Sequence, residues 1–363
     1  MISATDRTPR SGELREAFLQ TNSAETRRAP FRAPRTLINI AVSAMLLAVL
    51  AWLVDLRSLG QLLLAADPLL MAVAIAAALA DRALMIGKWY PLLRAQRVDV
   101  PLLRAARVYL AAGFASYFLP TSVGGDLFRA VALGRRQKKI VEVAASIIME
   151  RLLGVAASGI LAAVALAVAL EAGVSLYFLL PWAVGAIAAA IAAATLPLAP
   201  RFSVHVRRWL EAHPRSRWAQ IGLKFGAAYG LYRHHTRLLV IVGLLSVVEQ
   251  GFPILVFWIL GHALGIAVSA QALIVAVPLA LFVARLPIAV AGIGVLEGGL
   301  VVILGLFGMP MVAAVSLALA GRVVEVAGAL PGAFFWADLV KEPMPLREGG
   351  SAATERHDKD KLS

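Results

Sequence analysis

The sequence has no cysteine, and only 16% of its residues are charged. The absence of cysteine excludes disulfides, zinc–thiolate sites, iron–sulfur clusters and thiol nucleophiles. The charged fraction lies well below the roughly 25% of an ordinary soluble domain. Together with a hydrophobic fraction of 60%, these shortages exclude an ordinary soluble enzyme and a disordered basic protein.

What the chain does have is long apolar runs and a net charge of +13 over 363 residues. A chain this apolar can carry such a basic excess only if its charges are separated from its apolar segments. That separation is typical of a polytopic membrane protein with basic loops on one side. We therefore predict an all-α fold, a polytopic transmembrane helix bundle. Six full crossings are predicted, at Leu37–Val54, Pro68–Gly87, Ile140–Leu170, Ala172–Pro200, Leu238–Leu260 and Met311–Trp336.

The positions of Lys and Arg support this topology. Thirty of the 35 fall in segments on one predicted side of the membrane, and basic loops favour the cytoplasmic side. These segments are residues 1–36, 88–107, 126–139, 201–237 and the tail after Trp336. The prediction is a multi-pass protein of the cytoplasmic (inner) membrane with both termini in the cytoplasm. Lys88, Trp89 and Tyr90 are predicted to anchor the second crossing at the interface.

The domain organisation follows from the same pattern. Residues 1–36 are predicted to form a flexible basic cytoplasmic tail, 37–340 a single transmembrane domain, and 341–363 a polar cytoplasmic tail. Within the membrane domain, the basic loop 201–237 is expected to contact anionic lipid headgroups. Nucleic acid is not expected as a partner.

Two segments are too short or too broken to cross. Val108–Val123 has only 16 residues and basic loops at both ends, so we predict that it enters the membrane and returns to the same side. Residues 271–308 contain Pro287 and several glycines and are predicted to form a second re-entrant hairpin, entering from outside. Re-entrant backbone is tolerated only beside protein or a water-filled cavity. A threading with eight full crossings remains open.

The two broken segments resemble each other. The first runs from Leu119-Pro120 to Gly124-Gly125-Asp126, and the second from Leu286-Pro287 to Gly292-Ile293-Gly294 and Glu297. In each half, a helix with an ionic pair follows. This pattern predicts an inverted repeat with broken helices near the middle of the membrane.

Four arginines fall in neither the basic segments nor the outer loop: Arg82, Arg151, Arg285 and Arg322. Ionisable residues inside a membrane are costly and usually mark a pathway. Arg322 and Glu325 share a helix face, either as a neutralising pair or with the arginine holding an anion. Asp81–Arg82 and Glu150–Arg151 remain open between a site and an interfacial anchor.

Glu249 has no basic residue within ten positions on its own helix. We expect it to pair with Arg285 or Arg322, to be protonated, or to face water. Gly124, Gly125 and Asp126, followed by Arg129, suggest a phosphate site. Glycines let a ligand approach the amide groups of a helix start, and arginine binds phosphate through two hydrogen bonds. A plain glycine turn followed by an interfacial arginine is the alternative.

The chain resembles a known family in three places: Gly124-Gly125-Asp126-Leu127-Phe128-Arg129-Ala130, Glu150-Arg151, and Pro287 to Gly298 with Gly292, Gly294, Val295 and Glu297. These motifs resemble the lysylphosphatidylglycerol synthase transmembrane region family of flippase-like integral membrane proteins, over roughly residues 36–340. In two-part members of that family, a soluble domain transfers lysine from tRNA to phosphatidylglycerol, and the membrane region moves the product outward. The soluble part is expected to be absent here. The resemblance therefore implies lipid handling and not lysyl transfer.

The leading hypothesis is translocation of a phospholipid or lipid-linked headgroup between leaflets through a polar groove, with Arg129, Arg285 and Arg322 binding phosphate in turn. The alternatives are a non-catalytic membrane subunit that regulates or anchors a lipid- or glycan-synthesising enzyme, and a membrane-embedded transferase. No catalytic residue, metal or cofactor is predicted, and no nucleotide-binding motif occurs. The predicted substrate-binding residues are Gly124, Gly125, Asp126, Arg129, Glu150, Arg151, Glu249, Arg285, Gly292, Gly294, Glu297, Arg322 and Glu325.

Overall fold

The computed structural model describes residues 60–61, 64–117, 124–174, 176–212, 216–285 and 294–341. Within these ranges the secondary structure is helical, with no strand. The α-helices are α4 (Pro68–Ala95), α5 (Leu102–Ala115), α6 (Gly124–Gln137), α7 (Ile140–Glu171), α8 (Leu180–Thr195), α9 (Pro200–Glu211), α10 (Arg217–Gly230), α11 (Thr236–Glu249), α12 (Gly251–Ala263), α13 (Ala270–Ala284), α14 (Val295–Leu306), α15 (Met311–Ala329) and α16 (Pro331–Lys341). Three short 3-10 turns lie at Tyr177–Leu179, Leu196–Leu198 and Leu231–His235.

Five helical stretches of the described chain are long and apolar enough to cross a membrane: Pro68–Ala95, Ile140–Glu171, Leu180–Leu198, Trp218–Ala263 and Met311–Ala329. The predicted all-α, polytopic helix bundle is therefore confirmed. The predicted first crossing, Leu37–Val54, lies outside the described residues.

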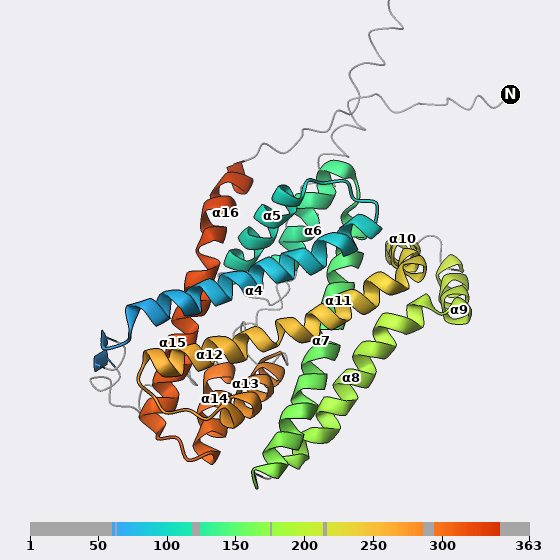
Figure 1. Cartoon of the computed structure of the whole chain (residues 1–363). Helices are drawn as coiled ribbons and strands as arrows, with labels where there is room; N and C mark the ends of the chain where they lie inside the picture. Colours follow the sequence, from blue (N-terminus) through green and yellow to red (C-terminus); the bar gives the residue numbers. More distant parts are fainter. Residues whose placement is uncertain are drawn as a thin grey trace, which may run out of the picture.

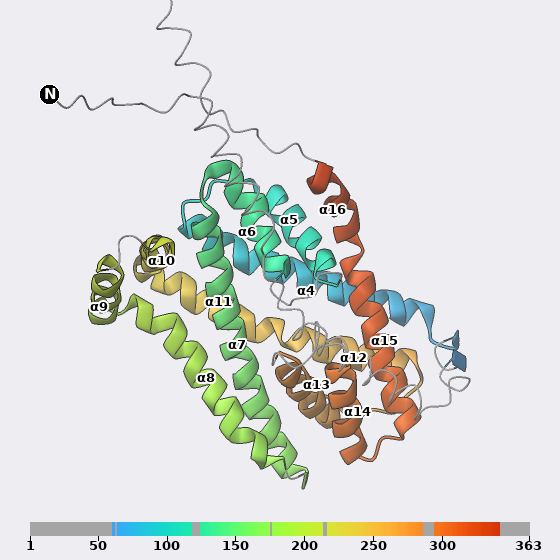
Figure 2. The same cartoon turned by 180° about the vertical axis from the view of Figure 1, so that it is seen from behind.

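The long helices form two crossing layers (Figures 1 and 2). Helices α7 and α8 form an antiparallel pair, and α4 lies beside α11 and α12, which run in the opposite direction. The Asp67 N–H, just before α4, donates to the Ala263 carbonyl at the end of α12 at 2.8 Å. Helix α15 packs on α4, and α16 continues toward α5. The main apolar core lies where α7, α12, α13, α14 and α15 meet.

Helix α4 begins where its sequence predicts and ends later than predicted. The Asp67 carboxylate accepts the Leu69 and Leu70 N–H groups, and Pro68 occupies the first helical position, which are both helix-start signals. The helix then continues to Ala95, with Pro91 inside it; the hydrogen bond that a proline cannot donate does not end the helix. The predicted interfacial anchor at Lys88 and Trp89 is wrong: Lys88 is 2% exposed and Trp89 is fully buried.

The predicted crossing Leu238–Leu260 consists of two helices, α11 and α12, that meet at Gln250. Pro253 lies in the first turn of α12 and has no N–H to donate to the preceding turn. The break therefore falls directly after Glu249, as the Gly251 and Pro253 pattern indicates. The last predicted crossing, Met311–Trp336, is likewise divided, into α15 and α16.

Four short helices form two pairs, α5 with α6 and α13 with α14. They have 14, 14, 15 and 12 residues, so at about 1.5 Å per residue each is shorter than the roughly 30 Å hydrocarbon core. Their tips, residues 118–123 and 286–293, lie outside the described residues. The re-entrant paths and the inverted repeat stay predictions.

The basic segment 201–237 is helical within its described part. It contains α9 and α10, which pack against each other. Exposed apolar side chains such as Val204, Trp209 and Trp218 share these helices with the basic residues. This mixture suits a membrane surface.

Candidate functional site

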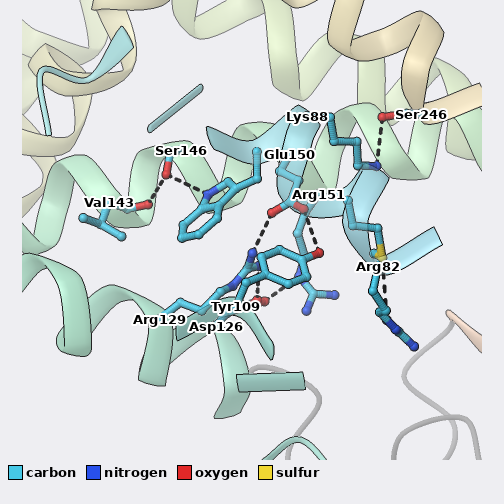
Figure 3. A network of polar contacts seen from close by, with 12 residues as sticks. Arg82, Lys88, Tyr109, Asp126, Arg129, Val143, Ser146, Glu150, Arg151 and Ser246 are labelled. Carbon is cyan, nitrogen blue, oxygen red and sulfur yellow. Dashed lines mark hydrogen bonds and ion pairs between the residues drawn. The ribbon is translucent and has the colours of Figure 1, made fainter. Parts of the chain in front are cut away.

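A first charged cluster joins α6 to α7 (Figure 3). It consists of Asp126, Arg129, Glu150 and Arg151 and is called the α6–α7 cluster. Arg129 Nη1 donates to Glu150 Oε2 at 2.8 Å, and Arg129 Nη2 to Asp126 Oδ1 at 2.7 Å. Arg151 Nε lies 2.5 Å from Asp126 Oδ2. The cluster is thus a chain of alternating charges, Glu150–Arg129–Asp126–Arg151, buried at its Glu150 end and accessible at Arg151, whose side chain is 57% exposed.

The Arg129 guanidinium is enclosed by protein. Its central carbon lies 4.8 Å from the Trp89 ring centre and 4.6 Å from that of Tyr109, within cation–π range. The Tyr109 hydroxyl donates to Glu150 at 3.0 Å. Arg129 is 5% exposed. With two carboxylates and two ring faces already engaged, its structural role is to hold α6 against α4, α5 and α7.

Gly125 has a packing role that the sequence did not suggest. A β-carbon at this position would lie 2.2 Å from Ser116 Oγ and 2.7 Å from the Ala112 carbonyl oxygen. Both atoms belong to the end of α5, so the glycine lets α6 approach α5 closely. Gly124 begins α6, one residue earlier. Asp126 and Arg129, one turn apart on α6, then face α7.

A second charged cluster joins α14 to α15. It consists of Glu297, Arg322 and Glu325 and is called the α14–α15 cluster. Arg322 Nε donates to Glu297 Oε1 at 2.6 Å, and Arg322 Nη1 to Glu325 Oε2 at 2.7 Å. Glu297 Oε2 also accepts the Gly294 N–H at 2.8 Å. Gly294 has φ +83°, a conformation that glycine adopts readily, so this residue shapes the start of α14.

Glu249 has a different partner from those expected. It forms a buried ion pair with Lys88 of α4, whose ammonium also donates to Ser246 Oγ at 3.1 Å. The predicted partners Arg285 and Arg322 are engaged elsewhere: Arg285 Nη1 donates to the Gly154 carbonyl at 2.8 Å. The prediction failed because Lys88 was assigned to a loop, whereas it lies on the inward face of a continuing helix.

Two cavities lie between these groups. The first, called the α5–α6 cavity, measures about 200 Å³ and is lined by α4, α5, α6, α7 and α15. The second, called the α12–α13 cavity, measures about 280 Å³ and is lined by α4, α12, α13, α14 and α15 together with Glu249 and Gln250. Three residues border both cavities: Arg82, Met85 and Glu325.

The predicted site residues divide between these features. Asp126, Arg129, Arg151 and Gly125 line the α5–α6 cavity, and Glu249 and Arg285 line the α12–α13 cavity. Glu150, Gly294, Glu297 and Arg322 support the walls through the clusters above. Gly292 lies outside the described residues.

Sequence reasoning missed Lys88, Trp89, Tyr109 and Ser246. Lys88 lies seven positions after Asp81, which places the two on one helix face; that spacing was a usable signal. No sequence signal pointed to Tyr109 or Ser246, since a single hydroxyl in an apolar run is common. Among the residues that the structure describes, no three His, Asp, Glu or Cys side chains are grouped so as to hold a metal ion.

The helices and the charged, internally paired clusters between them define a multi-pass integral membrane protein with polar cavities inside its bundle. The chain belongs to the family described as the lysylphosphatidylglycerol synthase TM region, whose model matches residues 36–332. This confirms the resemblance drawn from the motifs. Comparisons with curated proteins and with solved structures found no match.

Proposed function

We propose that this protein translocates a phospholipid, or a lipid-linked headgroup, between the leaflets of the cytoplasmic membrane. The observation that carries the proposal is the pair of adjoining cavities inside an apolar bundle. Charged side chains in such a place are costly, and a polar headgroup is the part of a lipid that needs them. The acyl chains would stay in the bilayer while the headgroup moves through the cavities.

The charges around the α5–α6 cavity suit an anionic headgroup. Arg82, Arg129 and Arg151 face Asp126 and Glu325 there. Because Arg129 is held by its own carboxylates, Arg151 is the member of the α6–α7 cluster that is most accessible. We assign Arg151 as an entry contact for phosphate, Arg129 as the residue that positions it, and Arg285 as a contact on the α12–α13 side.

The proposal includes the topology. Both termini would lie in the cytoplasm, and the basic, amphipathic α9 and α10 would rest on the anionic inner surface. The roughly 1 kcal/mol that each basic residue gains near such a surface would hold these helices at the interface. The path from the α5–α6 cavity to the α12–α13 cavity would then connect the two leaflets.

Reconstitution tests the proposal. The full chain is placed in vesicles that contain a fluorescent phosphatidylglycerol, and the fraction of label that an impermeant reductant can reach is followed over time. We expect faster loss of the inner-leaflet label than in protein-free vesicles. Label that moves no faster than in protein-free vesicles contradicts translocation, and a synthesising enzyme recovered stoichiometrically with the chain then favours the regulatory-subunit alternative.

Two variants sharpen that assay. Arg151→Gln removes the accessible cation from the α5–α6 cavity and should slow transfer of phosphatidylglycerol. Arg207→Gln is the matched control, because Arg207 is an exposed arginine on α9 that pairs with Glu211. Equal slowing by both variants would mean that the cavity is not the path.

A further inference from the structure

Arg82 differs from the other arginines in the interior of the bundle. Arg129 and Arg322 each contact two carboxylates, and Arg285 donates to a backbone carbonyl. Arg82 has no carboxylate within ion-pair distance among the described residues, and its hydrogen-bond acceptor is the Met85 sulfur at 3.6 Å. A thioether is a weak acceptor. Arg82 therefore retains a full charge and unused donors inside the bundle.

The position of Arg82 is as unusual as its partners. It is surrounded by protein on nearly every side, yet part of its side chain remains accessible because it borders both cavities. In Figure 3 its guanidinium extends away from the Glu150–Arg129 pair and does not join that network. Its neighbour Asp81 likewise has a buried carboxylate oxygen, Oδ1, without a hydrogen-bond partner. The polar network around residues 81 and 82 is thus incomplete.

Glu325 stands across from Arg82 at the same junction. It borders both cavities, and its carboxylate interacts electrostatically with Arg82 but pairs directly with Arg322. The boundary of the two cavities therefore presents a cation from α4 without a direct ion pair, and an anion from α15 that pairs with Arg322. Asp81, beside Arg82 on α4, interacts with it electrostatically from the α12–α13 side. Of the three residues that border both cavities, Arg82 is the cation, so an anion at their boundary would lie beside it.

We propose that Arg82 is the phosphate-binding residue at which a lipid headgroup passes between the two cavities. The ligand class is a phosphate ester carried on acyl chains, because planar guanidinium donors match phosphate oxygens. The inference rests on the proposed function and deepens it by naming the contact at the midpoint of the path. It also explains why an unpaired arginine is kept where an apolar residue would fit at lower cost.

The proposal makes an unusual prediction for stability. Removing a partnered buried charge destabilises a protein, because its partner is left alone. Removing Arg82 breaks no direct ion pair and weakens only its longer-range attraction to Asp81 and Glu325, so ligand-free Arg82→Gln should unfold close to the wild-type temperature. Arg129→Gln, by contrast, should unfold at a lower temperature. Thermal unfolding of the full chain in detergent, followed by the fluorescence of its seven tryptophans, measures both.

Binding is measured with three probes in the same preparation. Dihexanoyl phosphatidylglycerol has chains and phosphate, dihexanoylglycerol has the chains alone, and glycerol 3-phosphate has the phosphate alone. We expect Arg82→Gln to raise the Kd for phosphatidylglycerol by about tenfold or more, equivalent to about 1.4 kcal/mol. The Kd for dihexanoylglycerol should not change. Arg82→Lys, which keeps the charge but loses the planar fork, should fall between.

Arg94→Gln is the matched control. Arg94 lies on the same helix, three turns further on, and is half-exposed and paired with Asp99, so its removal should leave all three affinities unchanged. Tighter binding of phosphatidylglycerol than of glycerol 3-phosphate supports a lipid headgroup as the ligand. If phosphatidylglycerol and glycerol 3-phosphate bind equally well and both depend on Arg82, the phosphate site is supported and its ligand is a soluble phosphate ester.

Three results would overturn the proposal: an unchanged Kd for phosphatidylglycerol in Arg82→Gln, an equal loss of dihexanoylglycerol binding, or a ligand-free unfolding temperature lowered as far as in Arg129→Gln. Binding and transport are scored separately. Arg82-dependent binding without any wild-type lipid transfer would sink the proposed function and leave this site standing. Lipid transfer by the wild type, together with an unchanged Kd for phosphatidylglycerol in Arg82→Gln, would overturn this site and leave the proposed function standing.

Discussion

The α6–α7 and α14–α15 clusters have the same plan with the charges exchanged. In the first, the short helix supplies the arginine and the long helix the glutamate, 21 positions later; in the second, the short helix supplies the glutamate and the long helix the arginine, 25 positions later. Both pairs fasten a short helix to the long helix that follows it. The additional, more exposed member is a cation in the first cluster, Arg151, and an anion in the second, Glu325.

The exchange shows how one structural device can attach two different short helices to the bundle. The buried pair is electrically closed in both clusters, so it provides attachment without attracting a ligand. The additional member of each cluster is the more exposed one, and both Arg151 and Glu325 line the α5–α6 cavity. One cavity wall therefore carries both an accessible cation and an anion, and in the proposed function the cation is the contact for phosphate. The predicted inverted repeat would account for the shared plan.

The largest expected difference between the clusters is in stability. Arg129→Met leaves the buried Glu150 with only the Tyr109 hydroxyl, and breaking a buried pair in this way costs about 3–5 kcal/mol. Arg322→Met should cost less, because the Arg322 side chain is 18% exposed and Glu297 keeps its Gly294 contact. Thermal unfolding in detergent should rank Arg129→Met below Arg322→Met. The reverse order would contradict the comparison.

The double variant Arg129→Met/Glu150→Leu is the control for that experiment. Because it removes both charges of the pair, it should recover most of the loss seen in Arg129→Met alone. A double variant no more stable than Arg129→Met would mean that the aromatic contacts of Arg129, and not its ion pair, hold α6 in place.

A second expected difference lies in the glycines of the two short helices. Gly125→Ala introduces a β-carbon into the Ala112 carbonyl and the Ser116 hydroxyl, and overpacking of this kind costs about 1–3 kcal/mol. Gly298→Ala, near the start of α14, meets no atom within 4 Å and should be neutral or mildly stabilising. The unfolding temperatures of the two alanine variants measure the contrast. Equal temperatures would show that α6 can move away from α5 freely.

A third, smaller difference in stability is expected because Glu297 also caps the start of its helix, which Glu150 does not do. It both pairs with Arg322 and accepts the Gly294 N–H at the start of α14. Glu297→Gln loses the ion pair but keeps an amide oxygen for the N–H, whereas Glu297→Ala loses both. The alanine variant should be less stable than the glutamine variant by about 1 kcal/mol. Identical unfolding temperatures would remove the capping role.

The smallest effects on stability are expected at Arg151 and Glu325, the more exposed members of the two clusters. Lipid transfer is expected to be more sensitive than stability to changes there. Arg151→Gln and Glu325→Gln should each change stability by less than about 1 kcal/mol, as accessible ion pairs do. Transfer of phosphatidylglycerol should slow in the first variant and should not slow in the second. Vesicle assays with both variants measure this, and slowing in both would mean that the sign of the charge does not matter.

Much of the fold is predictable because apolar length and helix boundaries are local properties. Residues 140–170 were predicted as a crossing and form α7, and the break after Glu249 follows from Gly251 and Pro253. The end of α4 was not predictable in this way, since a lysine after an apolar run also suits an interface. The helix that lies opposite decides whether such a lysine is at the interface or buried. Here α11 supplies Glu249 as its partner, so Lys88 is buried and α4 continues.

The candidate site shows the same limit. Asp126, Arg129 and Glu150 could be selected from motifs, because each stands out in an apolar context. The separate roles of these residues could not be predicted from motifs. The rings of Trp89 and Tyr109 that enclose Arg129 come from other helices, whose positions depend on the packing of the whole bundle. Arg82 was selected only as an unresolved charge. Its significance depends on the lack of a direct ion pair among the described residues, which a sequence does not show.

The Lys88–Glu249 pair has a consequence for how the protein is made. Its two members are 161 positions apart, so at roughly 5–20 residues per second a ribosome needs about 8–30 s to supply the second after the first. During that interval α4 carries a lysine without its counter-ion. Entry of such a helix into lipid is opposed by the charge, which favours holding α4 at the insertion machinery until α11 emerges. A chain whose synthesis stops before residue 249 would leave α4 with an unmatched charge, a state that quality-control proteases can recognise.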